Sequence, residues 1–155
     1  MNYLKATLFI ATLLCSNFVQ SQTISDSFLI DGHYRTFHFN QPEAANTGAS
    51  LIFILHGSGG NGIKSMNGAK KLLALSESEN LLLVFPDGYK KHWNECRKNA
   101  PAAANVENID EHTFFSKMID YCVTNYKINP ARVFVTGTSG GAHGLQISLY
   151  DAGKI

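Results

Sequence analysis

A serine set among glycines, in Gly137-Thr138-Ser139-Gly140-Gly141, has the spacing of a nucleophile presented by a tight turn. Residues 132–136, with Val133-Phe134-Val135 at their centre, predict a short buried strand before this turn, and residues 140–150 can form a helix after it. Strained backbone angles in such a turn lift the serine hydroxyl clear of the sheet. Gly137 and Gly141 fit because side chains two positions from the serine would collide with the turn. The N–H of Gly140, at the start of the helix, faces a developing oxyanion.

A second glycine-rich segment, His56-Gly57-Ser58-Gly59-Gly60, follows the continuously apolar residues 51–55. That apolar run predicts a strand covered on both faces. Open α/β sheets place their sites at the carboxyl ends of such strands. The N–H groups of this segment can therefore point at an oxyanion. A phosphate-binding loop is the other interpretation, but it requires Gly-x-x-x-x-Gly-Lys-Ser/Thr, and Ile63 separates Gly62 from Lys64.

Further strands are expected around these two segments. Residues 27–39 predict a hairpin that turns at Asp31-Gly32, since Asp-Gly is a strong two-residue turn signal. Residues 81–85 are continuously apolar and predict another buried strand. The alternation of strands with helices predicts an α/β fold, with a mostly parallel sheet and helices on both faces.

Two helices are expected before the serine turn. The first covers residues 65–78. The second begins at Asn108, which can cap it with Glu111 as the capping-box partner. Apolar residues recur on one face of this second helix, and they are Phe114, Phe115, Met118, Ile119, Cys122, Val123 and Tyr126. We expect this face to cover the sheet.

The composition narrows the class of protein. The 155 residues suit a single domain, and 45% of them are hydrophobic. The formal net charge of +1 comes without a block of basic residues, which argues against nucleic acid as a partner. The histidines are scattered without metal-ligand spacing, so no metal is expected.

Residues 1–21 are typical of a secretory signal peptide, with Lys5 ahead of the apolar or small residues 6–19. We therefore expect a secreted or periplasmic protein, with residues 22–155 as the remaining domain and no stable association with a membrane. Cys96 and Cys122 remain after signal removal. In a secreted protein they can pair as a disulfide, or Cys122 can be a free buried thiol. Both alternatives stay open.

With both glycine-rich segments in order, the chain resembles the secreted α/β-hydrolase esterases that include poly(3-hydroxybutyrate) depolymerases, feruloyl esterases and acetylxylan esterases. The matching segments are residues 51–57, 84–88 with Trp93 downstream, 108–112 with Phe114-Phe115, and 128–141. The resemblance implies the α/β-hydrolase fold, Ser139 as the nucleophile, and N–H groups of Gly140 and Ser58 as the oxyanion hole. It implies an ester substrate, polymeric or small, and no cofactor. Trp93 either lines the substrate cleft or packs in the core.

One departure from that pattern concerns the other two catalytic residues. In such enzymes the acid and the histidine follow well after the serine, whereas this sequence ends 16 residues after Ser139. His143 lies only four residues after Ser139, so we do not expect it to be the base. We therefore expect the N-terminal part of a longer esterase, with a sheet truncated after the helix of the serine turn. A non-catalytic remnant or binding protein, and a serine peptidase or lipase of the same fold, stay open.

Overall fold

A five-stranded sheet with the order β1-β2-β4-β3-β5 forms the centre of the protein. The computed structural model describes residues 23–40, 47–95, 97 and 99–143. β1 (Thr23–Ile30) and β2 (His33–Asn40) form the expected hairpin, and β2 also pairs antiparallel with β4 (Leu81–Pro86). β3 (Ser50–Leu55) pairs parallel with both β4 and β5 (Val133–Gly137). The parallel part of the sheet thus comprises the three strands that follow the hairpin.

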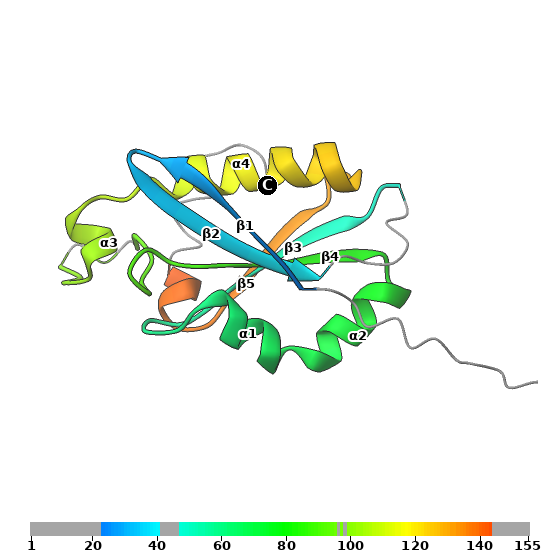
Figure 1. Ribbon diagram of the computed structural model, residues 1–155. Helices are drawn as coiled ribbons and strands as arrows, with labels where there is room; N and C mark the ends of the chain where they lie inside the picture. The colour runs from blue at the N-terminus through cyan, green and yellow to red at the C-terminus, as the bar shows by residue number, and fades with distance from the viewer. Residues whose placement is uncertain (1–22, 41–46, 96, 98, 144–155) are drawn as a thin grey trace, which may run out of the picture.

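Helices cover both faces of this sheet (Figure 1). α4 (Glu111–Tyr126) lies on one face, and α1 (Gly62–Gly68) and α2 (Lys70–Ser78) lie on the other. Beneath α4, Phe37, Phe53 and Phe114 are fully buried. Burial of a large apolar side chain contributes about 1.5–3 kcal/mol, so each of these phenylalanines stabilises the packing of α4 on the sheet. The predicted α/β fold is confirmed.

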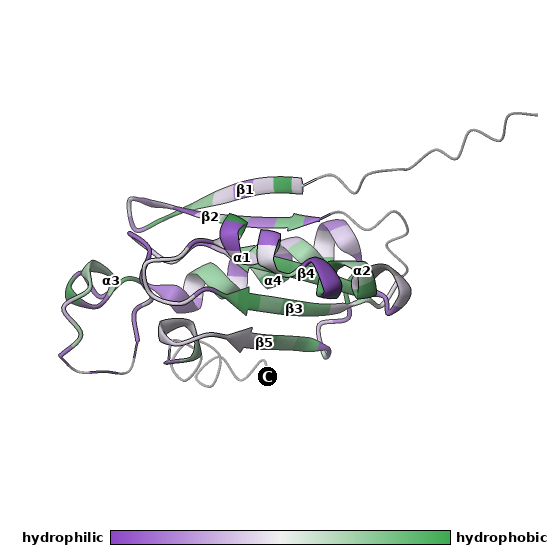
Figure 2. Ribbon diagram, turned by 90° about the horizontal axis from the view of Figure 1, so that it is seen from below, coloured by the Kyte–Doolittle hydropathy of each residue, from purple (hydrophilic) through white to green (hydrophobic). Residues whose placement is uncertain are grey.

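The apolar residues concentrate on the central strands, as Figure 2 shows in green for β3 and β4. Leu51, Phe53 and Leu55 of β3 point to the α4 side and are at most 2% exposed. Ile52 and Ile54 alternate with them and pack against the cluster under α1 and α2. A strand covered on both faces needs apolar residues at every position, which explains the unbroken run in the sequence.

The helix expected over residues 65–78 is two helices, because α1 ends at Gly68 and α2 begins at Lys70. Ala69 leaves helical geometry with φ −95° and ψ 24°. Glycine lacks helix propensity, so a break beside Gly68 costs little. The first helix also begins earlier than expected, because the Asn61 side chain caps it by accepting the Lys64 N–H at 2.8 Å.

The cap expected at Asn108 is wrong. Asp110 caps α4 instead, since its carboxylate accepts the Thr113 N–H at 2.9 Å. Asn108 has a left-handed φ of +47° and lies just after a short helix, α3 (Ala103–Val106), whose C-cap is Glu107. Glu111 does not complete a capping box, because its buried carboxylate binds Arg35 at 2.6 Å.

Several sequence predictions fall outside the described residues: the signal peptide at 1–21, Cys96, and the serine-turn helix beyond residue 143. Cys122 lies on the buried face of α4 and forms no disulfide with another described residue, and burial raises the pKa of its thiol to about 12. Its pairing with Cys96 stays a prediction. Within the described ranges, no helix has the length and apolar character needed to cross a membrane.

Candidate active site

Ser139 lies in a sharp turn between β5 and the start of a helix. Its φ is +52°, a left-handed conformation that side-chain-bearing residues rarely adopt. The Gly141 N–H donates to Thr138 O at 3.0 Å, and the His143 N–H donates to Ser139 O at 3.2 Å, so helical bonding begins immediately. The serine itself is exposed. Local strain of this kind, about 1–3 kcal/mol, persists only where the surrounding structure enforces it.

Gly137 and Gly141 enforce the turn by close packing. A Cβ on Gly137 would lie 2.7 Å from the Gly141 carbonyl carbon, and a Cβ on Gly141 would lie 2.7 Å from His56 O. Neither position has room for a side chain, because these distances are shorter than any normal contact. The two glycines therefore let the turn pack tightly against the end of β3.

The loop after β3 and the serine turn lie side by side, because β3 and β5 are parallel neighbours with Leu55 opposite Gly137. A Cβ on Gly57 would lie 3.5 Å from Ser139 Cβ. On the other side, a Cβ on Gly140 would lie 3.4 Å from the Ser58 backbone nitrogen. Gly140 is the first helical residue, so its N–H lacks a partner within the helix. The structure thus brings Ser58 and Gly140, the two predicted oxyanion donors, next to Ser139.

His56 holds this loop in place as a neutral imidazole. Its Nε2 accepts the Gly88 N–H at 2.9 Å, so Nδ1 carries the proton and donates to Gly57 O at 2.8 Å. Burial lowers the pKa of His56, against smaller opposing effects of the Gly57 hydrogen bond and the Asp87 charge. One ring nitrogen therefore binds the loop after β3 and the other binds the loop after β4, and His56 positions the backbone beside Ser139.

Trp93 anchors the same loop from the segment after β4. Its indole N–H donates to His56 O at 2.8 Å, and the two rings lie 5.0 Å apart. Only 2% of the residue is exposed, so most of the side chain packs in the core. Its remaining surface borders a cavity of about 350 Å³ beside the serine turn. This cavity is lined by Ser58, His92, Trp93, Glu95, Arg97, Ala100, Pro101 and Ala102.

An ionic cluster that the sequence did not predict lies at this cavity. The Glu95 carboxylate is buried and would lie 3.5 Å from a Cβ on Gly140. Nε and a terminal nitrogen of Arg97 bind one of its oxygens, and His143 Nδ1 lies 3.6 Å from the other. Arg97 thereby offsets the negative charge of this buried carboxylate. The sequence signal for this cluster is a carboxylate and an arginine two residues apart, Glu95 and Arg97, shortly after Trp93.

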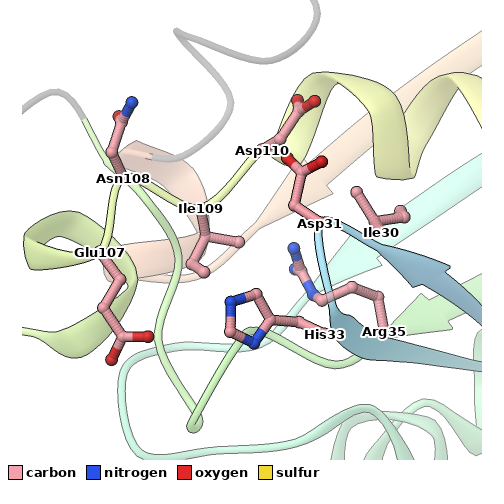
Figure 3. Close-up of a pocket in the computed structure, with 8 residues that line it drawn as sticks. All are labelled: Ile30, Asp31, His33, Arg35, Glu107, Asn108, Ile109 and Asp110. Carbon is pink, nitrogen blue, oxygen red and sulfur yellow. The ribbon is translucent and has the colours of Figure 1, made fainter.

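A smaller cavity, of about 60 Å³, lies where the hairpin meets the segment ahead of α4 (Figure 3). Arg35 and His33 reach it from β2, and Asp110 borders it from the start of α4. It shares no lining residue with the cavity beside Ser58. Arg35 is committed to Glu111 at 2.6 Å and to the ring of Phe114 at 4.4 Å, so we regard this cavity as part of the packing between hairpin and helix.

A metal centre finds no support in the part of the chain that the structure describes, where no cluster of three or more His, Cys, Asp or Glu side chains could hold an ion. The phosphate-loop interpretation also meets an obstacle. The Gly62 N–H at the start of α1 already donates to the Asp87 carboxylate at 2.6 Å. A carboxylate therefore lies where a phosphate would bind.

The sheet order and the serine turn after β5 define the class: the protein has the α/β-hydrolase fold. Comparison with known proteins agrees, although no family model matches the chain. An acetylxylan esterase of Coprinopsis cinerea is 25% identical over 105 residues, which are 66% of this chain and 27% of that protein. The predicted resemblance to esterases of this fold is confirmed by this relative.

Solved structures show the same fold. A thermostable esterase superimposes with a TM-score of 0.61 at 16% identity, over 85% of this chain and 38% of that one. An S-formylglutathione hydrolase from Agrobacterium tumefaciens gives 0.59 at 15% identity, over 80% of this chain and 51% of that one. The chain thus spans about half or less of these structures, and about a quarter of the acetylxylan esterase.

Proposed function

We propose that the protein is a serine esterase that hydrolyses carboxylic esters through an acyl-enzyme on Ser139. One observation carries this proposal: Ser139 is exposed at a φ of +52°, between the Gly57-Ser58 loop and the helical start at Gly140. Gly137 and Gly141, neither of which has room for a Cβ, hold the serine in this strained conformation. Packing alone does not require such strain. The same arrangement suits nucleophilic attack on a carbonyl.

The chemistry proceeds in two stages. Ser139 Oγ attacks the ester carbonyl, the hydroxyl proton passes to a general base, and the oxyanion receives the N–H groups of Gly140 and Ser58. The alcohol leaves and an acyl-enzyme remains, which water then hydrolyses. Loss of one oxyanion donor typically lowers kcat about 10²–10³-fold.

The general base and its acid belong, in this proposal, to sequence encoded after Ile155. Nearby histidines are otherwise engaged: His56 Nε2 accepts the Gly88 N–H, and His143 Nδ1 faces Glu95. Among the described residues, the hydrogen bond between His143 and Ser139 joins backbone atoms, His143 N and Ser139 O, and not the imidazole and the hydroxyl. A serine without its base retains only the part of the rate that comes from the oxyanion hole and binding, about 10³–10⁴ over water.

The proposed substrates are polyesters or the acyl esters of plant polysaccharides. The similarity to an acetylxylan esterase supports the second class. The cavity beside Ser58 has Trp93, Pro101 and Ala102 as apolar walls, which suits an acyl group or a sugar face. We further propose that residues 1–21 are removed on secretion, which mass analysis of the protein from the culture medium would test.

The deciding experiment expresses the protein from its complete coding region and treats it with a fluorophosphonate probe. We expect labelling at Ser139, loss of labelling in Ser139→Ala, and unchanged labelling in Ser65→Ala, a serine of α1 outside the site. Hydrolysis of acetylated xylan, lost in the same variant, would establish the ester class. A folded protein that does not label is instead a non-catalytic member of the fold. Preferential cleavage of peptides or of long-chain triglycerides would favour the peptidase or the lipase.

A further inference from the structure

Hydrogen bonds link a serine, a histidine and an aspartate at the hairpin edge of the sheet. Ser25 Oγ is 2.8 Å from His38 Nδ1, and His38 Nε2 is 3.2 Å from Asp87 Oδ2. Ser25 and His38 are directly opposite each other in β1 and β2, and Asp87 follows β4. β4 and β3 separate this group from β5 and Ser139 in the sheet.

The aspartate determines which nitrogen of His38 carries the proton. Burial alone would raise the pKa of Asp87, but hydrogen bonds from His38 and from the Gly62 N–H hold it below its ordinary value. An ionised carboxylate only accepts, so His38 Nε2 must donate to it. Nδ1 then presents a lone pair, and the Ser25 hydroxyl must donate to that lone pair. His38 stands to Ser25 as a general base stands to a nucleophile.

The imidazole cannot easily leave this orientation. His38 is 6% exposed, and α1 packs directly against it, since a Cβ on Gly62 would lie 2.8 Å from His38 Cδ2. The Asp87 carboxylate is fixed by its second bond, 2.6 Å from the Gly62 N–H. Base and aspartate are therefore preorganised behind the sheet edge.

The serine, in contrast, is accessible. β1 is the outer strand of the hairpin, and Ser25 is exposed on it. A purely structural hydrogen bond would tie β1 to β2 without requiring a fixed carboxylate behind the histidine. An exposed hydroxyl, a buried base and an ionised orienting group are together the arrangement that activates a nucleophile.

We propose that Ser25 is a second nucleophilic serine, which accepts acyl groups from small activated carboxylic esters with His38 as its base and Asp87 as a positioning residue. Ser25 Oγ attacks the carbonyl carbon while its proton passes to His38 Nδ1. The carbon–oxygen bond to the leaving alcohol breaks, the alcohol takes the proton, and an O-acyl serine remains. Atoms and charge balance without a further reactant.

The reactive esters should have good leaving groups. β1 is an extended strand, whereas the turn around Ser139 presents converging N–H donors to an oxyanion. Without such a turn, the activation comes mainly from the base, which contributes about 10²–10⁴-fold. Aryl acetates, whose phenolate leaves readily, fit this requirement.

Ser27 supplies a matched control within the same strand. It is exposed like Ser25 and lies on the same face, but Thr36 rather than a histidine stands opposite. The protein from its complete coding region, carrying Ser139→Ala, is incubated with 4-nitrophenyl acetate and mapped by tandem mass spectrometry. We expect acetyl on Ser25 about 10²-fold faster than on Ser27, and a decrease of similar size in His38→Gln.

Equal acetylation of Ser25 and Ser27 would overturn the proposal, as would a rate on Ser25 that His38→Gln leaves unchanged. The acetylation rates of Ser25 and Ser27 are compared within one folded sample. This comparison therefore tests the proposal even if His38→Gln does not fold. In protein with Ser139 intact, acetylation of Ser139 is read from a different peptide. The outcome for Ser25 and the outcome for the proposed esterase are therefore distinguishable.

Discussion

The Nε2 atom of His56 accepts the backbone N–H of Gly88 at 2.9 Å, and this bond joins the loop after β3 to the loop after β4. The Trp93 indole reinforces the connection by donating to His56 O. The two loops therefore behave as one support for the turn at Ser139. Because the imidazole must stay neutral to accept this bond, the support depends on pH.

We expect stability to fall in acid because of His56. Burial lowers its pKa, so between that lowered value and the ordinary value of about 6.5 the unfolded chain binds more protons than the folded protein. The contribution of neutral His56 to the free energy of unfolding is fully present above pH ~6.5 and is lost as the pH falls through the lowered pKa. Urea unfolding from pH 8 to pH 5 measures it. His56→Gln, which retains an acceptor for Gly88, should show a flatter profile, and parallel profiles would contradict the assignment.

Ser139→Gly should be more stable than Ser139→Ala by about 1 kcal/mol. Alanine keeps the cost of a side chain at φ +52°, whereas glycine adopts this conformation freely. Both variants lose the hydroxyl and should lose fluorophosphonate labelling equally. Guanidinium unfolding of the two proteins measures the difference. If alanine proved the more stable of the two, the turn would not be strained as described.

Gly141→Ala should destabilise the protein by about 1–3 kcal/mol, since its Cβ would lie 2.7 Å from His56 O and 2.8 Å from Leu55 O. Gly68→Ala is the matched control. It lies at the end of α1 with nothing within 4 Å of an added Cβ, so it should stabilise by about 0.5–1 kcal/mol. Thermal unfolding of both variants tests the opposite signs, and a tolerated Gly141→Ala would show that the turn can move.

Breaking the buried ion pair between Arg35 and Glu111 should cost about 3–5 kcal/mol for either single variant, Arg35→Met or Glu111→Leu, because the remaining charge is buried alone. Burial raises the pKa of Glu111 in spite of Arg35, which shows how strongly the site disfavours charge. The double variant should lose clearly less free energy of unfolding than the two single variants lose when their losses are added. A double-mutant cycle measures this coupling, and additive losses would mean that the pair contributes nothing specific.

Much of this architecture could be predicted from the sequence because local signals and tertiary packing agree. Asp31-Gly32 suits a two-residue hairpin turn in isolation, and the apolar run at 51–55 has no favourable place except a central strand. The glycine spacing around Ser139 reflects a steric requirement of a single turn, so this turn could also be predicted from the sequence.

Other features depend on contacts that are distant along the chain. Asp110 caps α4, while Glu111 beside it is drawn into the core by Arg35, 76 residues earlier. Nothing local distinguishes Asn108 from Asp110 as a cap. The same holds for Glu95 against Gly140 and for Ser25 facing His38, since strand register and loop packing bring these pairs together.

The thiol of Cys122 gives the experimenter an internal reporter of how often the protein opens. It is fully buried on the sheet-facing side of α4, and its pKa of about 12 leaves almost no thiolate at neutral pH. Alkylating reagents can reach it only when α4 separates from the sheet. The rate at which they modify this one sulfur, measured against denaturant, therefore gives the free energy of that separation without any engineered probe.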